Sequence, residues 1–133
     1  MVVVHLCRHA KAAGGDPDAL RELTRKGVEQ AHALGRLLAA SPDPPATVLS
    51  SPLVRARQTA EIVADETDAE LRIEPLLAPG ATVAELRRAV TGAGGAVATV
   101  GHQPDCSEIA LAVLGRDPGF PPGGTARVEL GSD

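Results

Sequence analysis

The stretch VVVHLCRHAK, residues 2–11, begins with β-branched and apolar residues and ends in an arginine, a histidine, an alanine and a lysine. An apolar run without polar alternation is typical of a strand buried on both faces of a parallel sheet. A buried strand has no structural need for Arg8 and His9 at its end, because charged and polar side chains are rarely buried without a partner. The pair therefore indicates a functional site whose remaining groups lie elsewhere in the chain.

Later segments also have strand character, and helical segments separate them. The predicted strands after residues 2–7 are 46–51, 70–75, 96–102 and 125–130. This alternation predicts an α/β fold, namely a three-layer α/β/α sandwich with a mostly parallel central sheet. The chain has 133 residues, of which 44% are apolar, so we expect a single domain over residues 1–133 with its own core.

Capping residues and apolar spacing predict the helices between these strands. Thr24 is the expected N-cap of the first helix. The buried face of that helix is predicted to consist of Val28, Ala31, Leu34, Gly35 and Leu38. Ser51 and Pro52 are expected to begin the second helix, and Thr82 and Glu85 fit a capping box at the start of the third.

Composition excludes several classes of function. The net charge is −4, there is one Phe and no Trp or Tyr, and no basic stripe is visible, so nucleic acid and membrane surfaces are poor partners. No apolar run of about 18 residues predicts a membrane span, and the first strand begins without a signal peptide. We therefore expect a cytoplasmic protein.

Polar residues follow three predicted strands. Arg8 and His9 follow the first strand, Arg55 lies early in the second helix, and His102 ends the strand at 96–102. Ligands of parallel sheets bind at the carboxyl ends of strands, so these side chains are expected to meet. Two guanidinium groups can hold a phosphate, and a neutral imidazole can attack phosphorus. Since arginine and histidine already meet the charge of the phosphate, we expect no metal.

Four blocks of the sequence resemble those of the histidine phosphatase (phosphoglycerate mutase-like) superfamily. They are RHA (8–10), LTRKG (23–27), SSPLVRARQTAE (50–61) and VGHQP (100–104), in the order and spacing of that family and spread over most of residues 1–115. Ala10 stands where the family has glycine, a replacement that a backbone with positive φ would disfavour.

This resemblance implies a role for each matching residue. His9 would be the nucleophile, Arg8 and Arg55 would clamp the phosphate, and His102 would contact it; we place Gln103 among the substrate-binding residues. The resemblance also implies a three-layer α/β/α fold, metal-independent phosphatase activity and no cofactor.

Within the superfamily, the short chain and short first loop are similar to the small bacterial phosphohistidine phosphatases (SixA-type). The mutase and metabolite-phosphatase branches have an acidic, Trp-containing segment after the third strand, where this chain has EPLLAPGATVAEL. Imidazole is a good leaving group and needs no strong acid, so phosphohistidine on a signalling protein is the predicted substrate. The candidates for a general acid are Glu74, Glu85 and Asp105.

Two other functions stay open. A small-molecule phosphomonoesterase acting on a metabolite or sugar would depend on one of those carboxylates, and a non-catalytic phosphate-binding module would tolerate the loss of His9. For a protein substrate, we expect docking near residues 11–22. Cys7 and Cys106 are interpreted as small buried residues, with a redox-sensitive pair as the alternative.

Overall fold

The apolar run at the start of the chain forms strand β1 (Val2–Arg8), which lies inside a five-stranded sheet of order β3-β2-β4-β1-β5. The other strands are β2 (Thr47–Ser50), β3 (Glu70–Ile73), β4 (Val97–Gly101) and β5 (Thr125–Leu130). β4 pairs in parallel with both β1 and β2, and β2 also pairs in parallel with β3. β5 pairs antiparallel with β1, so the predicted mostly parallel sheet is confirmed. This computed structural model describes residues 1–131, so residues 132–133 of the predicted domain lie outside the described residues.

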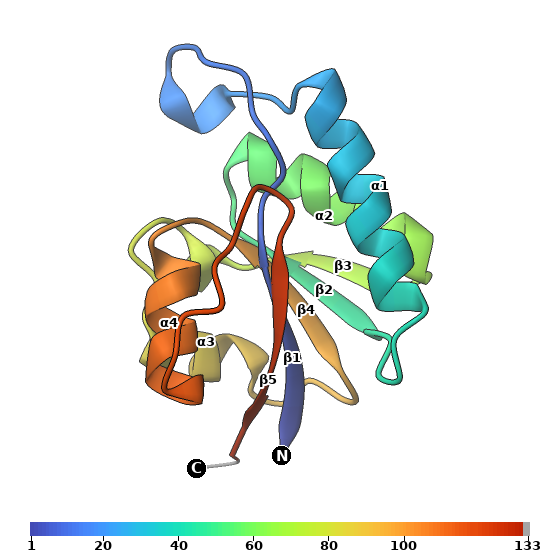
Figure 1. Cartoon of the computed structure of the whole chain (residues 1–133), viewed down its shortest axis with the longest axis vertical. Helices are drawn as coiled ribbons and strands as arrows, with labels where there is room; N and C mark the ends of the chain where they lie inside the picture. Colours follow the sequence, from blue (N-terminus) through green and yellow to red (C-terminus); the bar gives the residue numbers. More distant parts are fainter. Residues whose placement is uncertain (132–133) are drawn as a thin grey trace.

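Helices cover both faces of this sheet (Figure 1). α1 (Arg25–Ala39) and α2 (Val54–Thr67) lie on one face, and α3 (Val83–Val90) and α4 (Asp105–Leu114) lie on the other. Alternate residues of β1 point to opposite layers: Val4 and Leu6 join the apolar cluster of α3 and α4, and Cys7 joins that of α1 and α2. The predicted three-layer sandwich is therefore confirmed.

Short 3-10 helices lie in two connections, η1 (Asp18–Leu20) and η2 (Pro75–Leu77). In Figure 1, η1 lies at the end of the molecule where α1 and α2 begin, far from both chain ends. Within residues 1–131, no helix is both long enough and apolar enough to cross a bilayer.

The predicted helix starts are confirmed at two places and wrong at one. Thr24 caps α1 through the N–H of Gly27, and Thr82 and Glu85 form a complete capping box. The predicted start at Ser51 and Pro52 is wrong, because α2 begins at Val54. The N–H of Ser51 donates to the Val100 carbonyl in β4 at 3.0 Å, which keeps Ser51 extended beside the sheet.

One predicted core position of α1 is also wrong. Val28 is 39% exposed, and the buried face runs through Gly27, Ala31, Leu34, Gly35 and Leu38. A Cβ atom at position 27 would lie 2.1 Å from the Lys11 carbonyl oxygen, so only glycine fits this close approach. The contact turns Gly27 inward and leaves Val28 on the outside.

Candidate active site

The carboxyl end of β1 places His9 beside the end of β4. The N–H of His9 donates to the Gly101 carbonyl at 3.0 Å, and His102 follows directly. The centroids of the His9 and His102 rings are 5.2 Å apart, and the ring planes make an angle of 58°. Parallel pairing of β1 with β4 therefore brings together two histidines that are far apart in the sequence.

His9 is held as a neutral imidazole with a free nitrogen. Its Nδ1 lies 2.7 Å from the Ala10 carbonyl oxygen. A carbonyl can only accept, so Nδ1 carries a proton, and in the neutral ring the lone pair is then on Nε2. Burial is the largest cause that lowers the pKa of His9; the Ala10 hydrogen bond raises it, and the charge of Arg55 lowers it further.

Ala10 fits its position without strain. Its N–H donates to the hydroxyl of Thr59 at 3.0 Å, and that hydroxyl donates to the Arg55 carbonyl at 2.9 Å. Within residues 1–131, Asp68 is the one non-glycine residue with positive φ, so the backbone at Ala10 does not require glycine. The methyl group is fully buried.

Ser51 orients His102. The Ser51 hydroxyl lies 2.7 Å from His102 Nε2 and accepts the N–H of Leu53 at 3.3 Å. When this hydroxyl donates its proton to Nε2, the neutral imidazole carries its own proton on Nδ1. Burial, followed by the charges of His9 and Arg55, lowers the pKa of His102 to about 4, so this ring is neutral at pH 7.

Three arginines contribute to the electrostatic environment of His9. The charges of Arg55, Arg8 and Arg21 all act on His9. The Nε atoms of these arginines and Nδ1 of His102 are buried without a hydrogen-bond partner among the described residues. An unpaired buried N–H is costly, so four such groups around one imidazole fit an anion with several oxygens. A phosphoryl group has this charge and shape.

Two residues of this cluster were not predicted from the sequence. The carboxylate of Asp18 lies between two guanidiniums: Oδ1 is 3.1 Å from Arg21 and Oδ2 is 3.2 Å from Arg55. The Asp18 carbonyl also accepts from Arg55 at 2.9 Å. The segment at 11–22 was predicted to be a loop near which a protein substrate docks, and none of its residues was assigned to the site, although Arg21 stands two residues before the LTRKG block.

Four side chains that were predicted or considered for the site make their hydrogen bonds outside the His9 cluster. Gln103 makes both of its side-chain hydrogen bonds with Ser107 in α4. Each general-acid candidate accepts backbone N–H groups: Glu74 from Leu76, Glu85 from Thr82, and Asp105 from Gly80 and Ala81.

The two cysteines are buried thiols. Cys106 Sγ lies 3.5 Å from the Cys7 carbonyl, and burial raises the pKa of Cys7 to about 12 and that of Cys106 further still. Protonated thiols are poor nucleophiles, which argues against a redox-sensitive pair. Among residues 1–131, no three His, Cys, Asp or Glu side chains are grouped so that they could hold a metal ion.

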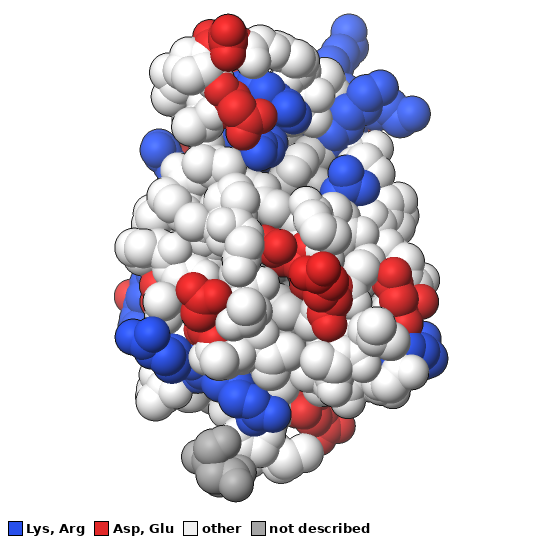
Figure 2. Space-filling view, turned by 90° about the vertical axis from the view of Figure 1, so that its left-hand side faces the viewer, with Lys and Arg blue, Asp and Glu red and all other residues white. Residues whose placement is uncertain are grey.

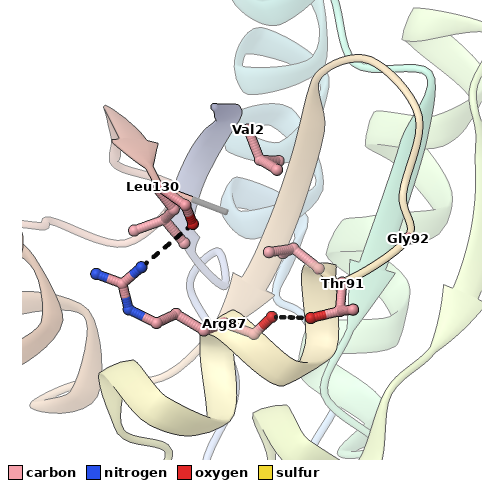
Figure 3. Close-up of a pocket in the computed structure, with 7 residues that line it drawn as sticks. Val2, Arg87, Thr91, Gly92 and Leu130 are labelled. Atoms are coloured by element: carbon pink, nitrogen blue, oxygen red, sulfur yellow. Dashed lines mark hydrogen bonds between the residues drawn. The ribbon is translucent and has the colours of Figure 1, made fainter. Parts of the chain in front are cut away.

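A separate pocket of about 160 Å³ lies at the other end of the sheet. Its lining includes Val2, Val90 and Leu130, and Arg87, whose guanidinium donates to the Gly131 carbonyl at 3.4 Å (Figure 3). The described lining contains no histidine, no carboxylate and no second arginine, so this pocket lacks the groups that gather around His9.

Comparison with known proteins places these features in a family. The model of the histidine phosphatase superfamily (branch 1) matches residues 4–79, which include His9 and Arg55. A comparison with curated proteins finds no match.

Solved structures resemble the whole fold. The protein histidine phosphatase SixA complexed with tungstate is 27% identical, with a TM-score of 0.85 over 98% of this chain and 89% of that one. A proposed phosphohistidine phosphatase SixA from Agrobacterium tumefaciens is 28% identical, with a TM-score of 0.80 over 94% of this chain and 89% of that one. A mycobacterial glucosyl-3-phosphoglycerate phosphatase shares the fold at 20% identity, with a TM-score of 0.63 over 85% of this chain and 79% of that one.

Proposed function

Because the chain belongs to the histidine phosphatase superfamily, we propose that it hydrolyses phosphohistidine on a signalling protein and forms a phosphohistidine intermediate at its own His9. The observation on which this rests is the environment of His9. Its Nδ1 proton is fixed by the Ala10 carbonyl, and the charges of Arg55 and Arg8 act on the ring. The Nε–H groups of both arginines are buried without a partner among the described residues. A neutral nucleophile beside a ready-made anion site is the arrangement that phosphoryl transfer needs.

The reaction has two displacements. In the first, the lone pair of His9 Nε2 forms a bond to phosphorus while the P–N bond to the substrate imidazole breaks. The substrate ring carries a proton from solvent on its other nitrogen, so it keeps that electron pair and departs as neutral imidazole. In the second, water attacks the phosphorus, loses a proton and releases inorganic phosphate, and Nε2 recovers its lone pair. Arg8, Arg55 and His102 Nδ1–H would hold the phosphoryl oxygens through both steps.

The substrate class follows from the leaving group. The conjugate acid of imidazole has a pKa of about 6.5, so imidazole is a good leaving group, whereas an alkoxide needs a proton from an acid. Glu74, Glu85 and Asp105 each accept backbone N–H groups, and among residues 1–131 none of these carboxylates bonds His9 or one of the three arginines. The similarity to SixA, solved with the tetrahedral oxyanion tungstate, supports the same class. A cytoplasmic location stays a prediction from the sequence.

A small-molecule phosphomonoesterase is the second candidate, and what favours it is the fold shared with the mycobacterial glucosyl-3-phosphoglycerate phosphatase. For this function, replacing one of the three carboxylates should sharply slow hydrolysis of alkyl phosphates. We expect Glu74→Gln, Glu85→Gln and Asp105→Asn to have no such selective effect.

The decisive experiment compares wild type with His9→Ala and with His32→Ala. His32 is a matched control, because its ring lies outside the site and bonds Glu66 at 2.7 Å. Each protein is assayed on a histidine-phosphorylated protein and on p-nitrophenyl phosphate, with a rapid alkaline quench to trap acid-labile phosphoenzyme. We expect turnover and phosphoenzyme in wild type and His32→Ala and neither in His9→Ala. Phosphate binding without turnover in wild type would instead indicate a non-catalytic module.

A further inference from the structure

Hydrolysis of a phosphoenzyme needs a group that takes a proton from water, and the carboxylates predicted for proton transfer are bound to backbone. The carboxylate that contacts the arginine cluster in the described part of the chain is that of Asp18, which bridges Arg21 and Arg55. Its side chain is 64% exposed, whereas His9 is only 9% exposed. Asp18 therefore lies at the mouth of the site and His9 at its base.

This position matches the geometry of an in-line displacement. When His9 attacks from the base, the leaving group departs toward the mouth, and water later attacks from that same side. The charge of the Asp18 carboxylate also acts on His102, whose pKa it raises. Figure 2 shows acidic and basic side chains in contact at the end of the molecule where the 11–22 segment lies.

The pairing with Arg55 leaves the phosphoryl site open. Asp18 uses the NH1 and NH2 groups of Arg55, through its carbonyl at 2.9 Å and its carboxylate at 3.2 Å. The Nε–H of the same guanidinium has no partner within residues 1–131. One arginine can thus hold the phosphoryl group on one edge and the carboxylate on the other.

We propose that Asp18 is the catalytic base that takes the proton from the water attacking phospho-His9. The water oxygen forms the new P–O bond, one water proton passes to the Asp18 carboxylate, and the P–Nε2 bond breaks with its electron pair returning to His9. The products are inorganic phosphate and a protonated Asp18, which then releases its proton to solvent. This inference rests on the proposed phosphoenzyme.

The test follows the decay of labelled phosphoenzyme after dilution into unlabelled substrate. We expect Asp18→Asn to slow decay by about 10²-fold while phosphoenzyme formation changes much less, because general-base catalysis contributes on that scale. Asp16→Asn removes an exposed carboxylate from the same segment, and its phosphoenzyme should decay at the wild-type rate.

A purely structural role for Asp18 is distinguished by chemical rescue. Added formate should accelerate decay in Asp18→Ala, and chloride at the same ionic strength should not, because formate can replace the missing base. Equal slowing of formation and decay in Asp18→Asn, or the absence of formate rescue, would overturn the assignment while leaving the phosphoenzyme intact. Failure to form any phosphoenzyme in wild type would overturn both the assignment and the proposed function.

Discussion

The two ends of the sheet present arginines in opposite ways. At the amino end of β1, Arg87 borders a pocket of about 160 Å³ and bonds the Gly131 carbonyl (Figure 3). At the carboxyl end, the Nε groups of Arg8, Arg21 and Arg55 are buried without partners among the described residues. An arginine that bonds a backbone carbonyl has less need of an anion than buried donors without a partner. The unpaired donors, rather than the volume of a cavity, are therefore what indicates the candidate site.

The largest expected effect is a difference in kcat/KM between two variants, Arg55→Lys at the carboxyl end of the sheet and Arg87→Lys at the amino end. Lysine keeps the charge but not the planar fork, so Arg55→Lys should lower kcat/KM on p-nitrophenyl phosphate by about 10²–10³-fold. Arg87→Lys should leave kcat/KM within about twofold of wild type. Similar losses in both variants would mean that the partnerless donors are not the phosphate site.

The carboxyl end is also held together by a close backbone approach, which two glycines test. A Cβ at Gly27 would meet the Lys11 carbonyl oxygen at 2.1 Å, whereas nothing lies within 4 Å of one at Gly14. Gly27→Ala should lower the free energy of unfolding by about 1–3 kcal/mol in urea titrations. Gly14→Ala should not lower it, and a comparable loss in both would contradict the contact.

Two exposed leucines test whether a protein substrate docks at the same end. Leu20 in η1 is 61% exposed and Leu37 in α1 is 60% exposed. Leu20→Ala should reduce kcat/KM on a histidine-phosphorylated protein by about tenfold, a cost typical of a single interface side chain, without changing that on p-nitrophenyl phosphate. Leu37→Ala should change neither value. If Leu20→Ala lowered kcat/KM on both substrates, the leucine would act on the phosphoryl site and not on docking of the protein substrate.

His102 is expected to affect the free energy of unfolding only in acid solution. Its folded-state pKa of about 4 lies below the ordinary 6.5, so between these values the unfolded chain binds a proton that the folded chain does not. The free energy of unfolding should therefore decrease as pH falls from about 6.5 towards 4, by less in His102→Asn than in wild type. Denaturant titrations over this range would measure the difference, and identical pH dependence in the two proteins would contradict it.

The smallest expected effect concerns the two cysteines. Because burial raises the pKa of both thiols, neither should react with Ellman's reagent at pH 8 in the native protein, and both should react in denaturant. Activity should then be insensitive to mild oxidants. Rapid labelling of the native protein, with loss of activity, would restore the redox-sensitive pair as an explanation.

The sequence alone determined the secondary structure and the edge of the sheet where the site lies. Apolar runs and the caps at Thr24 and Thr82 depend on residues a few positions apart, so local patterns predict them. The placement of Arg8, His9 and His102 follows from the rule that parallel strands end at one edge. For the same reason, the deviations at Ser51 and Val28 could not be predicted, since each depends on a contact with a distant segment.

Only the tertiary structure decided which groups complete the site. The segment at 11–22 has no periodic pattern; it is positioned by long-range hydrogen bonds, such as those from Thr24 N–H to the Lys11 carbonyl and from Leu23 N–H to Gln58. Those contacts bring Asp18 and Arg21 to Arg55, and strand pairing brings Ser51 to His102. Side-chain partners across distant segments follow from packing of the whole chain, and residue spacing does not encode them.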